Sequence, residues 1–221
     1  MLELREYTKS ELSSILGTSD RQGIRRKLER YNIDFDESGH GNNAVFEIKN
    51  IERPFKVFCI IDLGVPAQVD FDKMRDYLYY LFNYDGFADL PAVERRQILS
   101  SNGITISNQT ISHINSRLER SDYFNFNRSD CCYWAINKNS DGTKSYFPID
   151  HDLYCKGWKV YWDTVKATED SYYAYFKMTQ LVGGHPCKTP KIEYNGIYAD
   201  EIKTLHRLVN EDFLSYTIEK E

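Results

Sequence analysis

Apolar residues in the first part of the chain recur at helical spacing before they begin to alternate. Between residues 9 and 16 they fall on one side of a helix: Leu12, Ile15 and Leu16. Thr8 precedes this stretch as an N-cap, and Glu11 completes a capping box three residues later. Gly17 then ends the helix, because the residue after a helix often adopts positive φ.

A second helix and a hairpin follow this glycine. Ser19 or Asp20 caps the helix, which we expect to run to about Tyr31. Its apolar positions have the spacing i, i+4, i+7: Ile24, Leu28 and Tyr31. Residues 35–48 alternate partly around a glycine- and asparagine-rich tip at 39–43, which predicts a β-hairpin.

The rest of the chain predicts more helices and a second hairpin. Helices are expected at about 70–82, 91–101, 107–120, 154–166, 169–181 and 199–213. Strands are expected at 124–126 and 132–136, with a return at 146–147 after the turn at 139–142. Residues 51–68 are interpreted as a connector, whose apolar run is either a short strand or a buried link. The predicted fold class is α+β, mostly α.

Length and composition are those of a soluble globular protein. The chain has 221 residues, 41% of them hydrophobic and 28% charged, enough for two or three small domains. No apolar run is long enough to span a membrane, and the first residues lack the shape of a signal peptide. Five cysteines make a poor disulfide framework. We therefore expect a cytoplasmic protein of bacterial or phage type with no membrane association.

Charge is distributed unevenly along the chain. The net charge of −5 argues against indiscriminate nucleic-acid binding. The second predicted helix is nevertheless basic, with a single acid, Glu29, among five cations: Arg21, Arg25, Arg26, Lys27 and Arg30. On a helical wheel its polar side lies opposite Ile24 and Leu28, so the sequence predicts a local basic face.

The segment from Tyr7 to Asp20 resembles the helix-turn-helix of winged-helix regulators, including the MerR-like group. In that superfamily the second helix enters the major groove and the hairpin, or wing, contacts the backbone or the minor groove. The resemblance implies groove contacts from Gln22, Arg25 and Arg26, and phosphate contacts from Arg21, Lys27 and Arg30. It implies a wing tip formed by His40, Asn42 and Asn43. Glu29 departs from the pattern as an acid on the expected contact face.

A looser version of the same order occurs further along the chain. Residues 106–118 resemble the recognition helix of bacterial winged-helix proteins, through a Gln-Thr-Ile-Ser core and the leucine that follows. The resemblance implies base or phosphate contacts from five residues: Gln109, Ser112, His113, Ser116 and Arg117. The wing of this unit would be the predicted hairpin at 131–147. The alternative is a structural winged helix used for packing or dimerisation.

These features predict three segments: a winged helix-turn-helix at 1–51, a second winged-helix-like domain at 52–149, and a helical C-terminal region at 150–221. The expected function is sequence-specific binding of double-stranded DNA, by a transcriptional regulator or by an initiator of a plasmid or mobile element. The alternative is a protein-interaction module that uses an acidic, aromatic surface. In either case the C-terminal region would provide a homodimer or partner contact.

Enzymatic and metal-binding motifs are weak in this sequence. It contains no Walker loop, GxSxG, HExxH or GxGxxG motif, so neither catalysis nor a cofactor is expected. A zinc site is conceivable by residue type from His151, Cys155, His185 and Cys187. Their spacing matches no common zinc finger, and we expect no metal.

Overall fold

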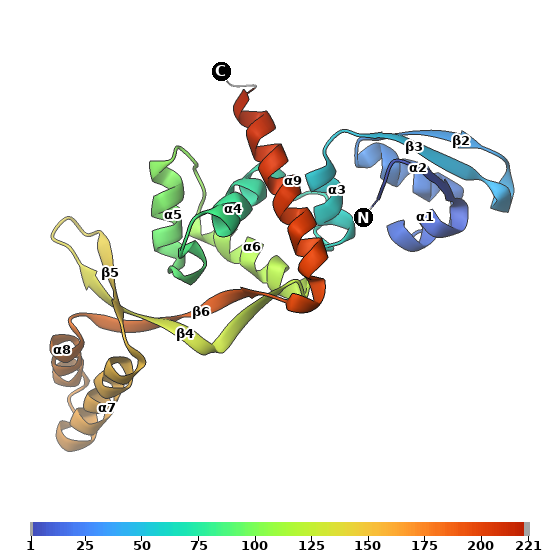
Figure 1. Cartoon of the computed structure of the whole chain (residues 1–221). Helices are drawn as coiled ribbons and strands as arrows, with labels where there is room; N and C mark the ends of the chain where they lie inside the picture. Colours follow the sequence, from blue (N-terminus) through green and yellow to red (C-terminus); the bar gives the residue numbers. More distant parts are fainter. Residues whose placement is uncertain (1, 219–221) are drawn as a thin grey trace. The chain divides into compact units, whose positions relative to one another are not determined.

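The computed structural model describes residues 2–218 and is α+β and mostly helical, as the sequence predicts (Figure 1). The helices are α1 Lys9–Leu16, α2 Arg21–Arg30, α3 Pro54–Ile61, α4 Phe71–Asn83, α5 Ala92–Ser101, α6 Asn108–Arg120, α7 His151–Thr168, α8 Ser171–Val182 and α9 Ala199–Ile218. The strands are β1 Glu6–Thr8, β2 Ile33–Ser38, β3 Val45–Ile51, β4 Phe124–Lys138, β5 Lys144–Ile149 and β6 His185–Tyr194. Within the described residues, no helix combines the length and the apolar character that a membrane span requires.

The chain forms two compact units that interleave along the sequence. Unit 1 contains residues 2–85, 99–124 and 194–218, and unit 2 contains residues 86–98 and 125–193. The boundaries of these units do not coincide with the expected boundaries at residues 51 and 149. The expected C-terminal region is divided between the two units, since α7 and α8 belong to unit 2 and α9 belongs to unit 1.

The first helix forms as its sequence predicts. α1 occupies residues 9–16, and Thr8 and Glu11 form both halves of the capping box. Gly17 follows in the left-handed conformation at φ 59°. The sequence does not predict β1, because three residues are too few to show an alternating pattern. β1 pairs antiparallel with β3, placing Tyr7 opposite Phe46.

A small antiparallel sheet completes this part of unit 1. Its strand order is β1-β3-β2. Along the chain, the hairpin formed by β2 and β3 follows α2 directly (Figure 1). α1 and α2 share one core with the sheet, formed mainly by Leu12, Leu16, Ile24, Leu28, Phe46 and Ile48. The buried stripes of both helices are those that the apolar spacing predicts.

The connector expected at 51–68 contains the helix α3, so the interpretation of its apolar run as a strand is wrong, whereas the run is buried, as the alternative of a buried link expects. Pro54 occupies the first turn of α3, where the missing amide proton costs no hydrogen bond. The helix buries Phe55, Val57, Phe58 and Cys59. A short run that is apolar all round has no clear period, so the sequence does not distinguish a buried helix from a strand.

The rest of unit 1 is helical. Asp70 caps α4 and Ser107 caps α6 through side-chain acceptors. α4 packs against α9, which buries Ile202, Leu205, Leu208 and Val209. Each of these helices thus buries the face that carries its regularly spaced apolar residues.

Unit 2 contains a three-stranded sheet, the helical hairpin formed by α7 and α8, and most of α5. The strand order is β5-β4-β6, and β4 is one long strand where the sequence suggested two short ones. β6 was not predicted, since Pro186 and Pro190 argue against a strand. It lies at an edge of the sheet, where a residue without an amide proton is tolerated.

Candidate nucleic-acid interface

The side chains of α2 point in four directions around the helix. Ile24 and Leu28 are fully buried in the core. Gln22, Arg26 and Arg30 are exposed on the opposite side. Arg21 and Arg25 contact the hairpin, and Lys27 contacts α1. The outward face of α2 therefore centres on Arg26.

Arg21 and Arg25 are bound to Glu37 on β2. The Nε–H of Arg21 donates to Oε1 of this carboxylate, and the Nε–H of Arg25 donates to Oε2. The Glu37 side chain is only 7% exposed. It lies directly opposite Phe46 in the hairpin register, on the face of the sheet that covers the helices. This link between α2 and β2 was not foreseen from the sequence.

Lys27 does not lie with the other cations. Its ammonium donates to the carbonyl oxygen of Leu16, at the C-terminal end of α1. A lysine at this position satisfies an unpaired helix carbonyl, and its positive charge interacts favourably with the negative end of the helix dipole. The phosphate contact suggested for Lys27 therefore competes with a structural role that fixes the angle between the two helices.

The hairpin tip is exposed. His40, Asn42 and Asn43 are all exposed, and the last two lie in the 3-10 turn Gly41–Asn43. Lys9 at the start of α1 donates to Asn42 Oδ1 at 3.2 Å, and the Lys9 amide donates to the Ala44 carbonyl at 3.0 Å. The tip is thus anchored to α1.

The turn before α2 depends on a glycine inside the helix. Asp20 caps α2 by accepting the amide of Gly23 at 2.6 Å. A Cβ at residue 23 would lie 2.4 Å from Thr18 Oγ1 and 2.6 Å from Asp20 Oδ2. A larger residue at position 23 would therefore displace the side chains of Thr18 and Asp20, including the cap.

Acidic side chains lie mainly on the outer face of the hairpin. Asp36 and Glu47 are opposite each other in the register, and both form ion pairs with Lys49. The Lys49 ammonium donates to these carboxylates, and these hydrogen bonds, first the one to Glu47, raise the pKa of Lys49. On α2 itself, Glu29 is exposed beside the cations. Only the α2 side of this region thus carries a surplus of cations.

The helix α6, predicted as the recognition helix of the second unit, offers fewer side chains for contact with DNA. On α6, the side chains of Gln109, Ser112, His113 and Ser116 are exposed, while Arg117 is half-buried. Gln109, His113 and Arg117 line a pocket of about 230 Å³ together with Asp70. The hairpin of β4 and β5, expected as its wing, belongs to unit 2, whereas α6 belongs to unit 1. The two are therefore not parts of one compact unit.

The four candidate metal ligands do not form one metal site. Cys155 Sγ lies 3.2 Å from His151 Nε2 on exposed turns of α7. His185 and Cys187 lie on β6. Within the described part of the chain, no group of three or more His, Cys, Asp or Glu residues has the arrangement of a metal site.

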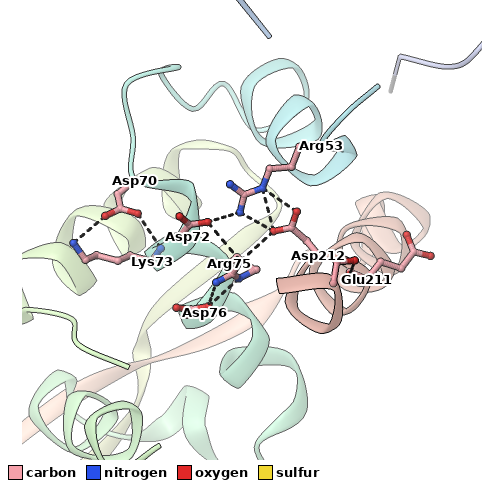
Figure 2. A network of polar contacts seen from close by, with 9 residues as sticks. Arg53, Asp70, Asp72, Lys73, Arg75, Asp76, Glu211 and Asp212 are labelled. Atoms are coloured by element: carbon pink, nitrogen blue, oxygen red, sulfur yellow. Dashed lines mark hydrogen bonds and ion pairs between the residues drawn. The ribbon is translucent and has the colours of Figure 1, made fainter. Parts of the chain in front are cut away.

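A buried ion network in unit 1 is the largest charged feature that sequence reasoning missed (Figure 2). Arg75 on α4 is 2% exposed and donates to Asp76 at 2.7 and 2.9 Å. Arg53 binds both oxygens of Asp212 on α9, at 2.7 to 3.1 Å, and Asp72 at 2.8 Å. Burial raises the pKa of Asp76, and Arg75 opposes that shift. The sequence signal for this network is Arg75, a cation on the apolar side of α4.

Comparisons of this chain with protein-family models, with curated proteins and with solved structures found no match. The site is therefore interpreted from its own geometry.

Proposed function

We propose that this protein binds double-stranded DNA sequence-specifically, with α1 and α2 as a helix-turn-helix and the β2–β3 hairpin as its wing. The observation that carries the proposal is the outward face of α2. Arg26 and Arg30 are exposed there, and their side chains make no hydrogen bond or ion pair with any described residue. Gln22 is exposed beside them, and the hairpin tip carries three further polar groups.

The chemistry of this face suits a duplex. The planar guanidinium of arginine matches both phosphate oxygens and the O6/N7 edge of guanine, and glutamine can bind an adenine edge through two hydrogen bonds. Glu29 can accept from a cytosine amino group. We infer that phosphate contacts supply most of the affinity and that Gln22 and Arg26 contribute to sequence preference. The biological role would be that of a transcriptional regulator or an initiator.

The test is binding to a short mixed-sequence duplex over a series of salt concentrations. Replacing both Arg26 and Arg30 by alanine should lower the affinity and reduce the slope of log K against log salt by about 0.9, the change expected for losing the single phosphate contact of Arg30. Thermal stability should hardly change, because both side chains are exposed.

A matched control removes two positive charges elsewhere. Lys156 and Lys159 are exposed on α7 in unit 2, and K156A/K159A changes the net charge by the same amount. This variant should keep the wild-type slope. Equal losses in both variants would show that only the overall charge matters, and no binding by the wild type at low salt would refute the proposal.

A second candidate function has its own observation. In unit 2 the helical hairpin exposes aromatic side chains that contribute little to its core: Trp162, Tyr172, Tyr173, Tyr175 and Phe176. Exposed aromatic residues of this kind are enriched at protein interfaces. If the protein binds no duplex, a protein-interaction module is therefore the favoured alternative.

A further inference from the structure

We propose that Glu37 is a positioning residue for DNA binding, which holds Arg21 and Arg25 with their terminal amino groups free for the duplex. The inference rests on the proposed function of α2. By charge alone, the acidic residue Glu37 would be expected to disfavour DNA binding.

The hydrogen-bond pattern shows why the two arginines stay available. Each carboxylate oxygen of Glu37 accepts from one guanidinium, and in both cases the donor is Nε–H. A guanidinium has five N–H donors, of which Nε carries one. Among the described residues, no other group binds either Arg21 or Arg25. The terminal amino groups, which form the usual fork for phosphate or guanine, are therefore unused.

Burial distinguishes Glu37 from its neighbours on the hairpin. Its side chain is 7% exposed, whereas the side chain of Asp36, the adjacent residue on the opposite face of the sheet, is 76% exposed. A carboxylate removed from water needs partners, and Glu37 has two cations. The three side chains together retain a charge of one positive unit, so the cluster still attracts phosphate.

Holding the guanidinium groups before DNA arrives reduces the entropy cost of binding. A long side chain that becomes ordered only at an interface weakens the complex, and Glu37 would order two such side chains in advance. Substituting Glu37 by glutamine should therefore lower affinity by about tenfold, the size expected for losing the order of one or two side chains.

Simple electrostatics predicts the opposite sign. E37Q removes a negative charge from beside the proposed interface, so a purely coulombic effect would tighten DNA binding. D36N removes the same charge one residue away, on the outer face of the sheet. Comparing the two variants separates positioning from charge.

The experiment measures affinity for a short mixed-sequence duplex at fixed low salt. We expect E37Q to bind more weakly than the wild type and D36N to bind equally or more tightly. In the R21A/R25A background, E37Q should have no further effect, because Glu37 acts through these two arginines. E37D, which keeps the charge on a shorter side chain, should recover part of the affinity. Thermal unfolding of each variant checks that it is folded.

Two results would overturn the inference, and they are distinguishable. If E37Q is folded and binds as tightly as the wild type or more tightly, Glu37 does not position the arginines for DNA. If E37Q weakens binding equally in the R21A/R25A background, its effect does not pass through them. A wild-type protein that binds no duplex at all would instead refute the proposed function, and this role of Glu37 with it.

Discussion

At the scale of single residues, buried charge determines which substitutions this protein tolerates. Arg75 is 2% exposed, and the side chain of Asp212, which binds Arg53 and lies 3.6 Å from Arg75, is 15% exposed. Together they join the residue before α3 to α4 and α9 (Figure 2). A buried ion pair adds little when both partners are present, but losing one partner leaves an uncompensated charge.

Replacing Asp212 by alanine should lower the free energy of unfolding by about 1–3 kcal/mol, less than for an isolated pair, because Arg53 and Arg75 keep Asp72 and Asp76 as partners. The measurement is urea denaturation followed by circular dichroism. D200A is the control on the same helix, because the Asp200 side chain is 92% exposed and its ion pair with Lys203 should contribute little. If D212A were as stable as D200A, the network would not stabilise unit 1.

At the scale of elements, helix ends show how local sequence fixes local structure. Thr8, Asp20, Asp70, Ser107 and Asp150 each accept an amide hydrogen bond at the start of a helix. Such caps depend on neighbouring residues alone, so sequence reasoning can identify them. The capping box that Thr8 forms with Glu11 also involves a titratable carboxyl group, which makes α1 sensitive to pH.

The pKa of Glu11 is lowered, mainly because its carboxylate accepts the backbone amide and the hydroxyl of Thr8. A carboxyl group whose pKa is lower in the folded state stabilises that state above its ordinary pKa, and this contribution is lost as the pH falls through the lowered value. We expect the wild type to lose more stability on acidification than E11Q, which has no carboxylate to protonate. Denaturation at neutral and acidic pH tests this, and parallel losses would contradict it.

At the scale of the whole molecule, the longer of the two segments of unit 2, residues 125–193, leaves unit 1 and returns to it at one place. The amide of Asn195 donates to the carbonyl of Tyr123 at 3.0 Å, and its side chain donates to Asp122 at 2.8 Å. Residues 125–193 of unit 2 are therefore an insertion whose ends are adjacent within unit 1. Closing a short loop between such ends costs little entropy.

Replacing residues 125–193 with a short Gly/Ser linker should leave unit 1 folded, while residues 86–98, the other segment of unit 2, lose their packing partners. α2, the hairpin tip and the Arg53–Asp212 pair all lie in the retained segments. The shortened protein should unfold cooperatively on heating and keep the salt dependence of wild-type duplex binding. Loss of cooperative unfolding would show that unit 1 depends on the insertion, and retained folding without binding would show that unit 2 contributes to the interface.

The sequence by itself determined most of the helices, their caps and their buried faces. Periods such as Ile24–Leu28 and pairs such as Thr8–Glu11 require only local interactions. It also identified the basic helix α2 as the candidate site. It failed for α3 and β6, because a short apolar run has no period and two prolines are acceptable only at a sheet edge.

Only the tertiary structure decided how the cations of α2 differ from one another. Arg21, Arg25, Lys27 and Arg30 have similar chemistry and are close in sequence. Contacts with Glu37 and with the Leu16 carbonyl distinguish them, and these partners come from β2 and α1. The division into interleaved units is likewise a tertiary property, because it depends on packing between residues distant along the chain. A local pattern specifies a helix and its exposed side, whereas the partner of each exposed charge depends on which other elements pack beside it.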